Sequence, residues 1–274
     1  MIPAAFDYVR AGSTEEAISL LGEHGDDAKL LAGGHSLLPL MKLRLATPAV
    51  LIDVGRVSGL SYVRDDGDQI AIGALTRHHD VATNPVALDG APVLAHVAGQ
   101  IGDPQVRHRG TIGGSIAHGD PASDLPAVLC ALGGTLIAQG PTGRREIGAN
   151  EFHKGFLETA LAPDELLVEI RVPRSPGTQW GFEKLTKRAQ DWAIVGAVVA
   201  RTDRGVGVGL INMGAVPMRA GAVEAAVASD ASAADAAELA AEGTDPAADV
   251  NASVEYRQHV ARVLVRRALE KAGV

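Results

Sequence analysis

The sequence of 274 residues contains a single cysteine, Cys130. An iron–sulfur cluster needs about four protein ligands, usually thiolates, and a thiolate zinc site needs several as well. The chain therefore holds neither metal centre alone, and an internal disulfide is excluded. Cys130 lies in the apolar, helix-like stretch 125–132, which predicts a buried, unreactive thiol.

Positive charge and long apolar runs are also scarce. The formal net charge is −8, which argues against a nucleic-acid or anionic-membrane partner. No apolar run approaches the roughly 18 residues of a membrane helix, and the N-terminus lacks the features of a secretory signal. We expect a globular cytoplasmic protein with no membrane span and no nucleic acid.

Glycine, in contrast, is concentrated in two informative turns. Gly33-Gly34 lies within 32–36 (AGGHS), and Gly113-Gly114 lies within 111–115 (TIGGS). Paired glycines permit positive φ, and successive N–H groups in such a turn converge into an anion site. Because both turns adjoin apolar, strand-like runs, they predict a pyrophosphate held from two sides.

Neither turn matches a common nucleotide loop. The first lacks the third glycine of G-x-G-x-x-G and the Lys-[Ser/Thr] of a Walker-type loop. A Rossmann nucleotide domain is therefore disfavoured. A diphosphate that meets backbone N–H groups and hydroxyls remains, which suits FAD better than magnesium-bound ATP.

Periodicity and turn signals divide the chain into three regions. In the first, Ser13 and Glu16 form a capping box that starts a helix near Thr14. Strands are expected at 29–32, 50–54, 69–73, 135–139, 166–173, 181–184, 193–201 and 206–213, with a hairpin through 140–147. Helices are expected at 37–42, with the first glycine turn at its N-terminus, within 229–251 on the surface, and from about Ser253 to Lys271.

The two motifs, with the residues around them, resemble the FAD-binding (medium) subunit of the molybdenum hydroxylase family. The resemblance looks strongest to the medium subunit of aerobic carbon monoxide dehydrogenase and covers essentially the whole chain. The residues that support it are 32–42 (AGGHSLLPLMK), 109–126 (RGTIGGSIAHGDPASDLP), Tyr256-Arg257 and 265–269 (VRRAL).

This resemblance implies an α+β fold. Residues 1–175 would form an FAD-binding domain of the vanillyl-alcohol-oxidase/PCMH type in two α+β subdomains, 1–55 and 56–175. Residues 176–274 would form a C-terminal domain of the carbon monoxide dehydrogenase flavoprotein type, with a small antiparallel sheet and helices.

The resemblance also implies a binding site. Both turns would wrap the FAD pyrophosphate, Asp124 would accept hydrogen bonds from the ribityl–ribose side, and a loop with Lys184 and Trp192 would reach over the isoalloxazine. Relatives often have Tyr where Trp192 stands. The implied cofactor-binding set is Leu31, Ala32, Gly33, Gly34, His35, Ser36, Leu37, Ile101, Gly102, Thr111, Gly113, Gly114, Ser115, Asp124, Leu167, Lys184, Asp191 and Trp192. No metal ligand and no acid–base catalyst is expected in this chain.

The implied function is electron transfer. A large subunit would hold the molybdenum cofactor, a small one the iron–sulfur clusters, in a dimer of heterotrimers, and the flavin would pass electrons to an external acceptor. Carbon monoxide is the expected substrate. The alternatives are hydroxylation of N-heterocycles, aldehydes or nicotine-like compounds, a stand-alone flavin reductase, or a non-catalytic interaction protein.

Several polar residues leave two interpretations open. Asp124 suits a helix cap as well as a sugar ligand, and His118 suits a flavin pocket as well as loop structure. The cluster 107–109 (RHR) would dock a partner or phosphate, or be solvated. His78-His79 is interpreted as a solvent-facing pair at a helix start.

Overall fold

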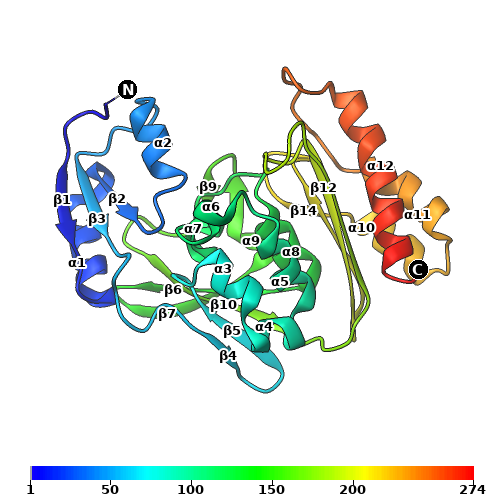
Figure 1. Cartoon of the computed structure of the whole chain (residues 1–274), viewed down its shortest axis with the longest axis horizontal. Coiled ribbons are helices and arrows are strands. Elements are labelled where there is room, and N and C mark those ends of the chain that lie inside the picture. The colour runs from blue at the N-terminus through cyan, green and yellow to red at the C-terminus, as the bar shows by residue number, and fades with distance from the viewer. Residues whose placement is uncertain (1) are drawn as a thin grey trace.

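The computed structural model describes residues 2–274, which form three units in a row (Figure 1). The first is a three-stranded parallel sheet in the order β1-β3-β2, with two helices and a 3-10 turn. Its elements are β1 (Asp7–Arg10), α1 (Thr14–His24), η1 (Gly25–Asp27), β2 (Ala28–Leu31), α2 (Leu37–Lys42) and β3 (Val50–Asp53). The capping box is confirmed, because Ser13 Oγ accepts the N–H of Glu16 at 3.1 Å and the Glu16 carboxylate accepts that of Gly12 at 2.6 Å.

The second unit is a five-stranded antiparallel sheet in the order β4-β5-β10-β6-β7, covered by short helices (Figure 1). Its strands are β4 (Val63–Asp65), β5 (Gln69–Gly73), β6 (Thr135–Gly140), β7 (Gly143–Gly148) and β10 (Leu166–Pro173), with a small hairpin β8 (His153–Gly155) and β9 (Glu158–Thr159). Its helices are α3 (His78–Thr83), α4 (Pro85–Gly90), α5 (Pro92–Gly99), α6 (Pro104–Arg107), α7 (Ile112–Ala117), α8 (Asp124–Leu132) and α9 (Ala149–Phe152).

The third unit is a four-stranded antiparallel sheet in the order β11-β12-β13-β14. Its elements are β11 (Trp180–Leu185), β12 (Val195–Thr202), β13 (Gly205–Ile211), β14 (Met218–Arg219), α10 (Gly221–Ala228), α11 (Ala233–Glu238), η2 (Leu239–Ala241) and α12 (Val254–Lys271). The last helix covers the outer face of the sheet at the C-terminal end of the molecule (Figure 1).

Strand β12 joins the second and third units because both of its faces are buried. Val195, Ala197 and Val199 pack in the core under α12, whereas Val198 and Ala200 pack in the core of the second unit. A strand covered on both faces is apolar throughout instead of alternating, which explains the continuous apolar run from 195 to 200.

Helix α8 lies directly on β13, and two glycines make this contact possible. A Cβ at Gly207 or Gly209 would overlap the carbonyl oxygens of Ala131 and Ala127 in α8. The helix backbone therefore rests against the strand backbone. This close contact fixes the position of α8, the helix that begins at Asp124.

The α+β fold with its small antiparallel C-terminal sheet is confirmed, and most of the expected strands lie within a few residues of their predicted positions. The surface helix expected within 229–251 exists only as α11, and its Ala236 is fully buried in the core rather than on the surface. The Cys130 prediction is confirmed, since the thiol is buried and burial raises its pKa to about 12. None of the described helices is both long enough and apolar enough to cross a bilayer.

The contact between α8 and β13 makes Gly209 intolerant of a side chain. We expect Gly209→Ala to lower the free energy of unfolding by about 1–3 kcal/mol, because an inserted methyl forces the backbones apart. Urea denaturation followed by circular dichroism measures this. Gly22→Ala is the control: its Cβ would meet open space within α1, so it should leave stability unchanged or raise it. Equal stability of both variants would contradict the tight contact.

Candidate functional site

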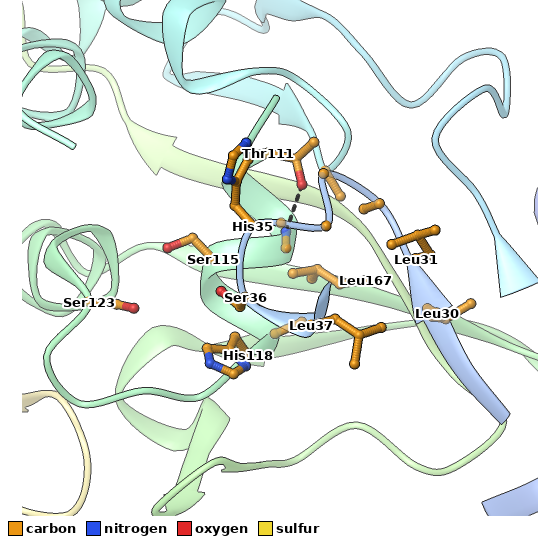
Figure 2. A pocket seen from close by; sticks show the side chains of 18 of the residues that line it. Leu30, Leu31, His35, Ser36, Leu37, Thr111, Ser115, His118, Ser123 and Leu167 are labelled. Atoms are coloured by element: carbon orange, nitrogen blue, oxygen red, sulfur yellow. Dashed lines mark hydrogen bonds between the residues drawn. The ribbon is translucent and has the colours of Figure 1, made fainter. Parts of the chain in front are cut away.

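A cavity of about 710 Å³ lies where the three units meet. Its walls include both glycine turns and the loop between β11 and β12. Figure 2 shows Ser36 of the first turn and Ser115 of the second around this pocket, with His118 and Ser123 beside them. The volume lies within the range of about 300–1,000 Å³ typical of cofactor sites.

Every residue of the expected cofactor-binding set lines this one cavity. The structure thus brings together positions separated by more than 150 residues of chain. That each of these residues contacts the cofactor stays a prediction.

The first glycine turn connects β2 to α2 and presents its backbone to the cavity. Gly34 has φ of +79°, a conformation that favours glycine. Among the described residues, the N–H groups of positions 33–36 donate to no protein acceptor. A row of unused donors is what an anionic oxygen requires.

The second glycine turn differs from its expectation. Its N–H groups are already used: that of Gly113 donates to Ala74 O at 2.8 Å and that of Gly114 donates to Thr111 Oγ1 at 3.1 Å. A Cβ at Gly113 would lie 2.5 Å from the Cβ of Ala74. The expectation that both turns offer converging N–H groups is therefore wrong for the second turn. Its glycines serve close packing, and the turn lines the cavity with Thr111, Gly113, Gly114 and Ser115.

A buried ion pair lies on the opposite wall of the cavity. Lys184 Nζ of β11 lies 2.8 Å from Asp124 Oδ2 at the start of α8, and the side chains are 13% and 5% exposed. Burial raises the pKa of Asp124, while the Lys184 charge opposes that shift. Ser123 occupies the cap position of α8 and the Asp124 side chain caps nothing, so the capping alternative is wrong.

One carboxylate oxygen of Asp124 is available to a ligand. Its Oδ1 is buried and has no hydrogen-bond partner among the described residues. An unpartnered buried acceptor is costly, and a sugar-like hydroxyl would satisfy it. The residues present therefore fit FAD, which combines a pyrophosphate for the first turn with ribityl and ribose hydroxyls for this carboxylate.

The positive charge of Lys184 is largely offset by its partner. Because Asp124 lies against its ammonium group, the pair is close to neutral as a whole. The pair connects the second unit to the third, since Asp124 begins α8 and Lys184 lies on β11.

His78 is a cavity residue that the sequence interpretation missed. It is 3% exposed, so the expected solvent-facing position is wrong. Burial, followed by the neighbouring charges of His35, Arg77 and Arg107, lowers the pKa of His78 to about 4. Its ring packs on Gly110, where a Cβ would lie 2.7 Å from the His78 Cδ2. Gly110 next to the second motif was the available signal, but the sequence alone does not pair it with α3.

His118 also lines the cavity, which favours its pocket interpretation, and burial lowers its pKa. Further wall residues were missed because none of them belongs to a recognisable motif. They include Leu21, Gly25, Asp26 and Lys29, and Leu157, Glu158, Thr159, Leu161, Ala162 and Pro163 near the β9–β10 connection.

Trp192 lies at the cavity wall and is 57% exposed, as expected for a residue near a ligand. Its loop is shaped by an ion pair from Arg188 to Asp191 at 3.0 Å and by Gln190 at φ of +70°. Within residues 2–274 no group of three or more His, Cys, Asp or Glu side chains is placed to hold a metal ion.

Removing Lys184 tests the buried pair. We expect Lys184→Met to lower the free energy of unfolding by about 3–5 kcal/mol near pH 8, because Asp124 is left buried and unpaired. A carboxyl whose pKa is higher in the folded than in the unfolded protein costs stability only when ionised. The loss should therefore shrink as the pH falls toward about 4.

The control for that variant is the double replacement Lys184→Met with Asp124→Leu, which removes both charges and should recover most of the stability. Urea titrations at several pH values measure all three proteins. A loss in Lys184→Met that is independent of pH would contradict the assignment.

Comparison with known proteins identifies the family of the chain. Residues 4–175 match the family described as FAD binding domain in molybdopterin dehydrogenase, and residues 180–272 match the CO dehydrogenase flavoprotein C-terminal domain. The carbon monoxide dehydrogenase medium chain of Hydrogenophaga pseudoflava is 41% identical over 99% of this chain and 98% of its own length. The 6-hydroxypseudooxynicotine dehydrogenase complex subunit alpha of Paenarthrobacter nicotinovorans is 40% identical over 99% and 96%.

Solved structures give the same relationship. Carbon monoxide dehydrogenase from Hydrogenophaga pseudoflava matches with a TM-score of 0.95 and 42% identity, covering 100% of this chain and 99% of that one. Quinoline 2-oxidoreductase from Pseudomonas putida 86 matches with a TM-score of 0.92 and 31% identity over 100% and 99%. The chain belongs to the family of FAD-binding medium subunits of molybdenum hydroxylases.

Proposed function

We propose that this FAD-dependent oxidoreductase subunit takes electrons from iron–sulfur clusters of a small partner subunit and delivers them to an external acceptor. A large partner would hold the molybdenum cofactor, and two such heterotrimers would associate. The observation that supports this best is that both glycine turns and the Asp124–Lys184 pair line one cavity of a size typical of cofactor sites.

FAD supplies the electron-transfer chemistry when it is bound, and the protein sets its position and environment. The first turn would hold the pyrophosphate through the unused N–H groups of Gly34, His35 and Ser36. Asp124 would accept a sugar hydroxyl at Oδ1, while Lys184 keeps that carboxylate ionised and in place. We also propose the domain division at residues 1–55, 56–175 and 176–274, and each remaining residue of the expected set as a wall of the flavin site.

Carbon monoxide is the proposed substrate of the assembled enzyme, supported by relatives at 41% and 40% identity that are named carbon monoxide dehydrogenase medium chains. A second candidate is an enzyme for nicotine-like compounds, supported by the 40% identical relative. Both share this subunit's task, because substrate would react at the large subunit. The cytoplasmic location stays a prediction.

Purification of the native complex tests the assignment. We expect a yellow protein with one larger and one smaller partner, containing molybdenum and iron. Carbon monoxide should bleach the flavin absorbance anaerobically, whereas a nicotine-like compound should not; the reverse result would select the second candidate. A yellow chain that purifies alone, and whose flavin a nicotinamide reduces directly, would contradict the proposal in favour of a stand-alone reductase.

A side chain introduced into the first glycine turn should weaken FAD binding. In Gly33→Ala the new methyl would overlap the carbonyl oxygen of Arg109, which separates the two turns and should lower the FAD content at least about tenfold, the effect of roughly 1.4 kcal/mol. Gly148→Ala is the control, because its Cβ has only ordinary contacts near 3.9 Å. Flavin absorbance per folded chain is the measurement, and full FAD content in Gly33→Ala would contradict the role of the turn.

Trp192 should affect the reoxidation rate of the flavin more than the affinity for FAD. We expect Trp192→Ala to retain FAD but change the rate at which the reduced flavin is reoxidised, because an exposed aromatic cover over the cavity is removed. Trp192→Tyr should restore the original rate. Stopped-flow absorbance measures this, and unchanged kinetics in Trp192→Ala would assign the loop to structure alone.

A further inference from the structure

A second hollow adjoins the first glycine turn. Its volume is about 390 Å³, and residues Leu31 to Gly34 form a wall that it shares with the cofactor cavity. The rest of its lining is Leu38, Asp53, Gly55, Arg56, Arg77 and Arg109. We call it the arginine groove.

The groove lies where parallel strands end. Both β2 and β3 run into it, since Leu31 is the last residue of β2 and Asp53 the last of β3. In parallel sheets the carboxyl ends of strands are where ligands commonly bind. The position of this edge therefore suits a ligand, and the arginines in its lining favour an anion.

Three guanidinium groups face the groove without an acidic partner. Within residues 2–274, none of Arg56, Arg77 and Arg109 has a carboxylate oxygen within 4.0 Å. The one acidic group in the lining, Asp53, is already engaged: its Oδ2 accepts Tyr8 Oη at 2.5 Å and its Oδ1 accepts the N–H of Gly55 at 2.7 Å. The groove therefore holds an excess of positive charge in a chain whose formal net charge is −8.

Of the three arginines, Arg77 is held by the protein, whereas the side chains of Arg56 and Arg109 are exposed. Arg77 is half-buried and donates from Nη1 to the carbonyl oxygen of Arg109, and its backbone pairs with Thr111. Burial and then the nearby Arg109 charge lower the pKa of Arg77, while the charges of Asp80 and Asp53 oppose that shift. Neighbouring guanidinium groups such as Arg77 and Arg109 repel each other, and an anion that lies between them stabilises both.

The three residues of the 107–109 cluster do not act together here. Arg107 donates to the carbonyl oxygens of Ile101 and Gly102 at 3.0 Å, and the His108 ring stacks on that of His79 with centroids 4.0 Å apart. Only Arg109 contributes to the groove, where it joins Arg56 and Arg77 from other parts of the chain.

The geometry points to a second anion site in this subunit: the arginine groove, which adjoins the first glycine turn, binds a small oxyanion, a phosphate or a carboxylate group. Planar guanidinium groups match the paired oxygens of such anions. The source is either a free anion or an acidic side chain of a partner subunit, and the experiment separates the two.

The test uses the FAD-loaded chain, so that the cofactor's own pyrophosphate site is filled. Inorganic phosphate is titrated calorimetrically at constant ionic strength, against chloride. We expect saturable binding of one phosphate, weakened about tenfold or more in Arg56→Gln and in Arg109→Gln, since a charge-assisted hydrogen bond is worth about 1.5–3 kcal/mol. Arg201→Gln is the control, an exposed arginine on β12 that lies outside the groove; it should bind phosphate as the original chain does.

Flavin content is measured in every variant, which separates this proposal from the assignment of the cofactor site. Normal flavin with lost phosphate binding supports the groove. The proposal is overturned if the FAD-loaded chain shows no saturable phosphate binding. If Arg56→Gln in addition has a lowered flavin content, the arginines contribute to binding of the FAD pyrophosphate instead.

The source of the anion follows from the same titration on the assembled complex. Binding that persists there assigns a free phosphate or carboxylate. Binding that disappears on assembly, together with weaker association of Arg56→Gln with its partner subunits, assigns a partner carboxylate in the groove.

Discussion

The close approach of two backbones, at Gly33 and at Arg109-Gly110, is the constraint on which the site depends. A Cβ at Gly33 would overlap the Arg109 carbonyl and lie 2.9 Å from the Gly110 Cα. The first unit therefore meets the second with no side chain between them. Residues of this contact line both the cofactor cavity and the charged groove.

Two further contacts extend this arrangement to the third unit. The glycines of β13 let α8 rest on the C-terminal sheet, and α8 begins with Asp124, whose partner Lys184 lies on that sheet. A buried ion pair adds little net stability compared with apolar residues, but it is strict about geometry. Its value here is to fix one carboxylate oxygen at the cavity wall without a protein partner.

Sequence motifs located the cavity because its most constrained residues are contiguous. Segments 32–36 and 111–115 have glycine for backbone reasons, and the resemblance to a family added Asp124, Lys184 and Trp192 from distant segments. All of them line one cavity. The strands were also predictable, since alternation and turn residues are local signals.

The features that the sequence did not predict are mostly those that depend on contacts between distant segments. His78 is polar and follows Thr76 at a helix start, so local rules place it in solvent; it is buried because Gly110 leaves room for its ring. The short helices α4 and α5 begin at prolines and are too brief to show a helical period. The arginine groove draws Arg56, Arg77 and Arg109 from three loops, a grouping that no spacing in the sequence reveals.

The unequal use of N–H groups changes how the two glycine turns are understood. They look equivalent as sequences, yet the first leaves its donors unused and the second donates to Ala74 and to its own Thr111. A second turn with all donors engaged is a rigid surface, whereas the first is a set of donors that gains partners only when an anion arrives. The electrostatic attraction for a pyrophosphate is therefore concentrated on the first turn. The three arginines line the adjoining groove and not the cofactor cavity, so the donors of the first turn and the guanidinium groups offer two separate sets of partners for anions.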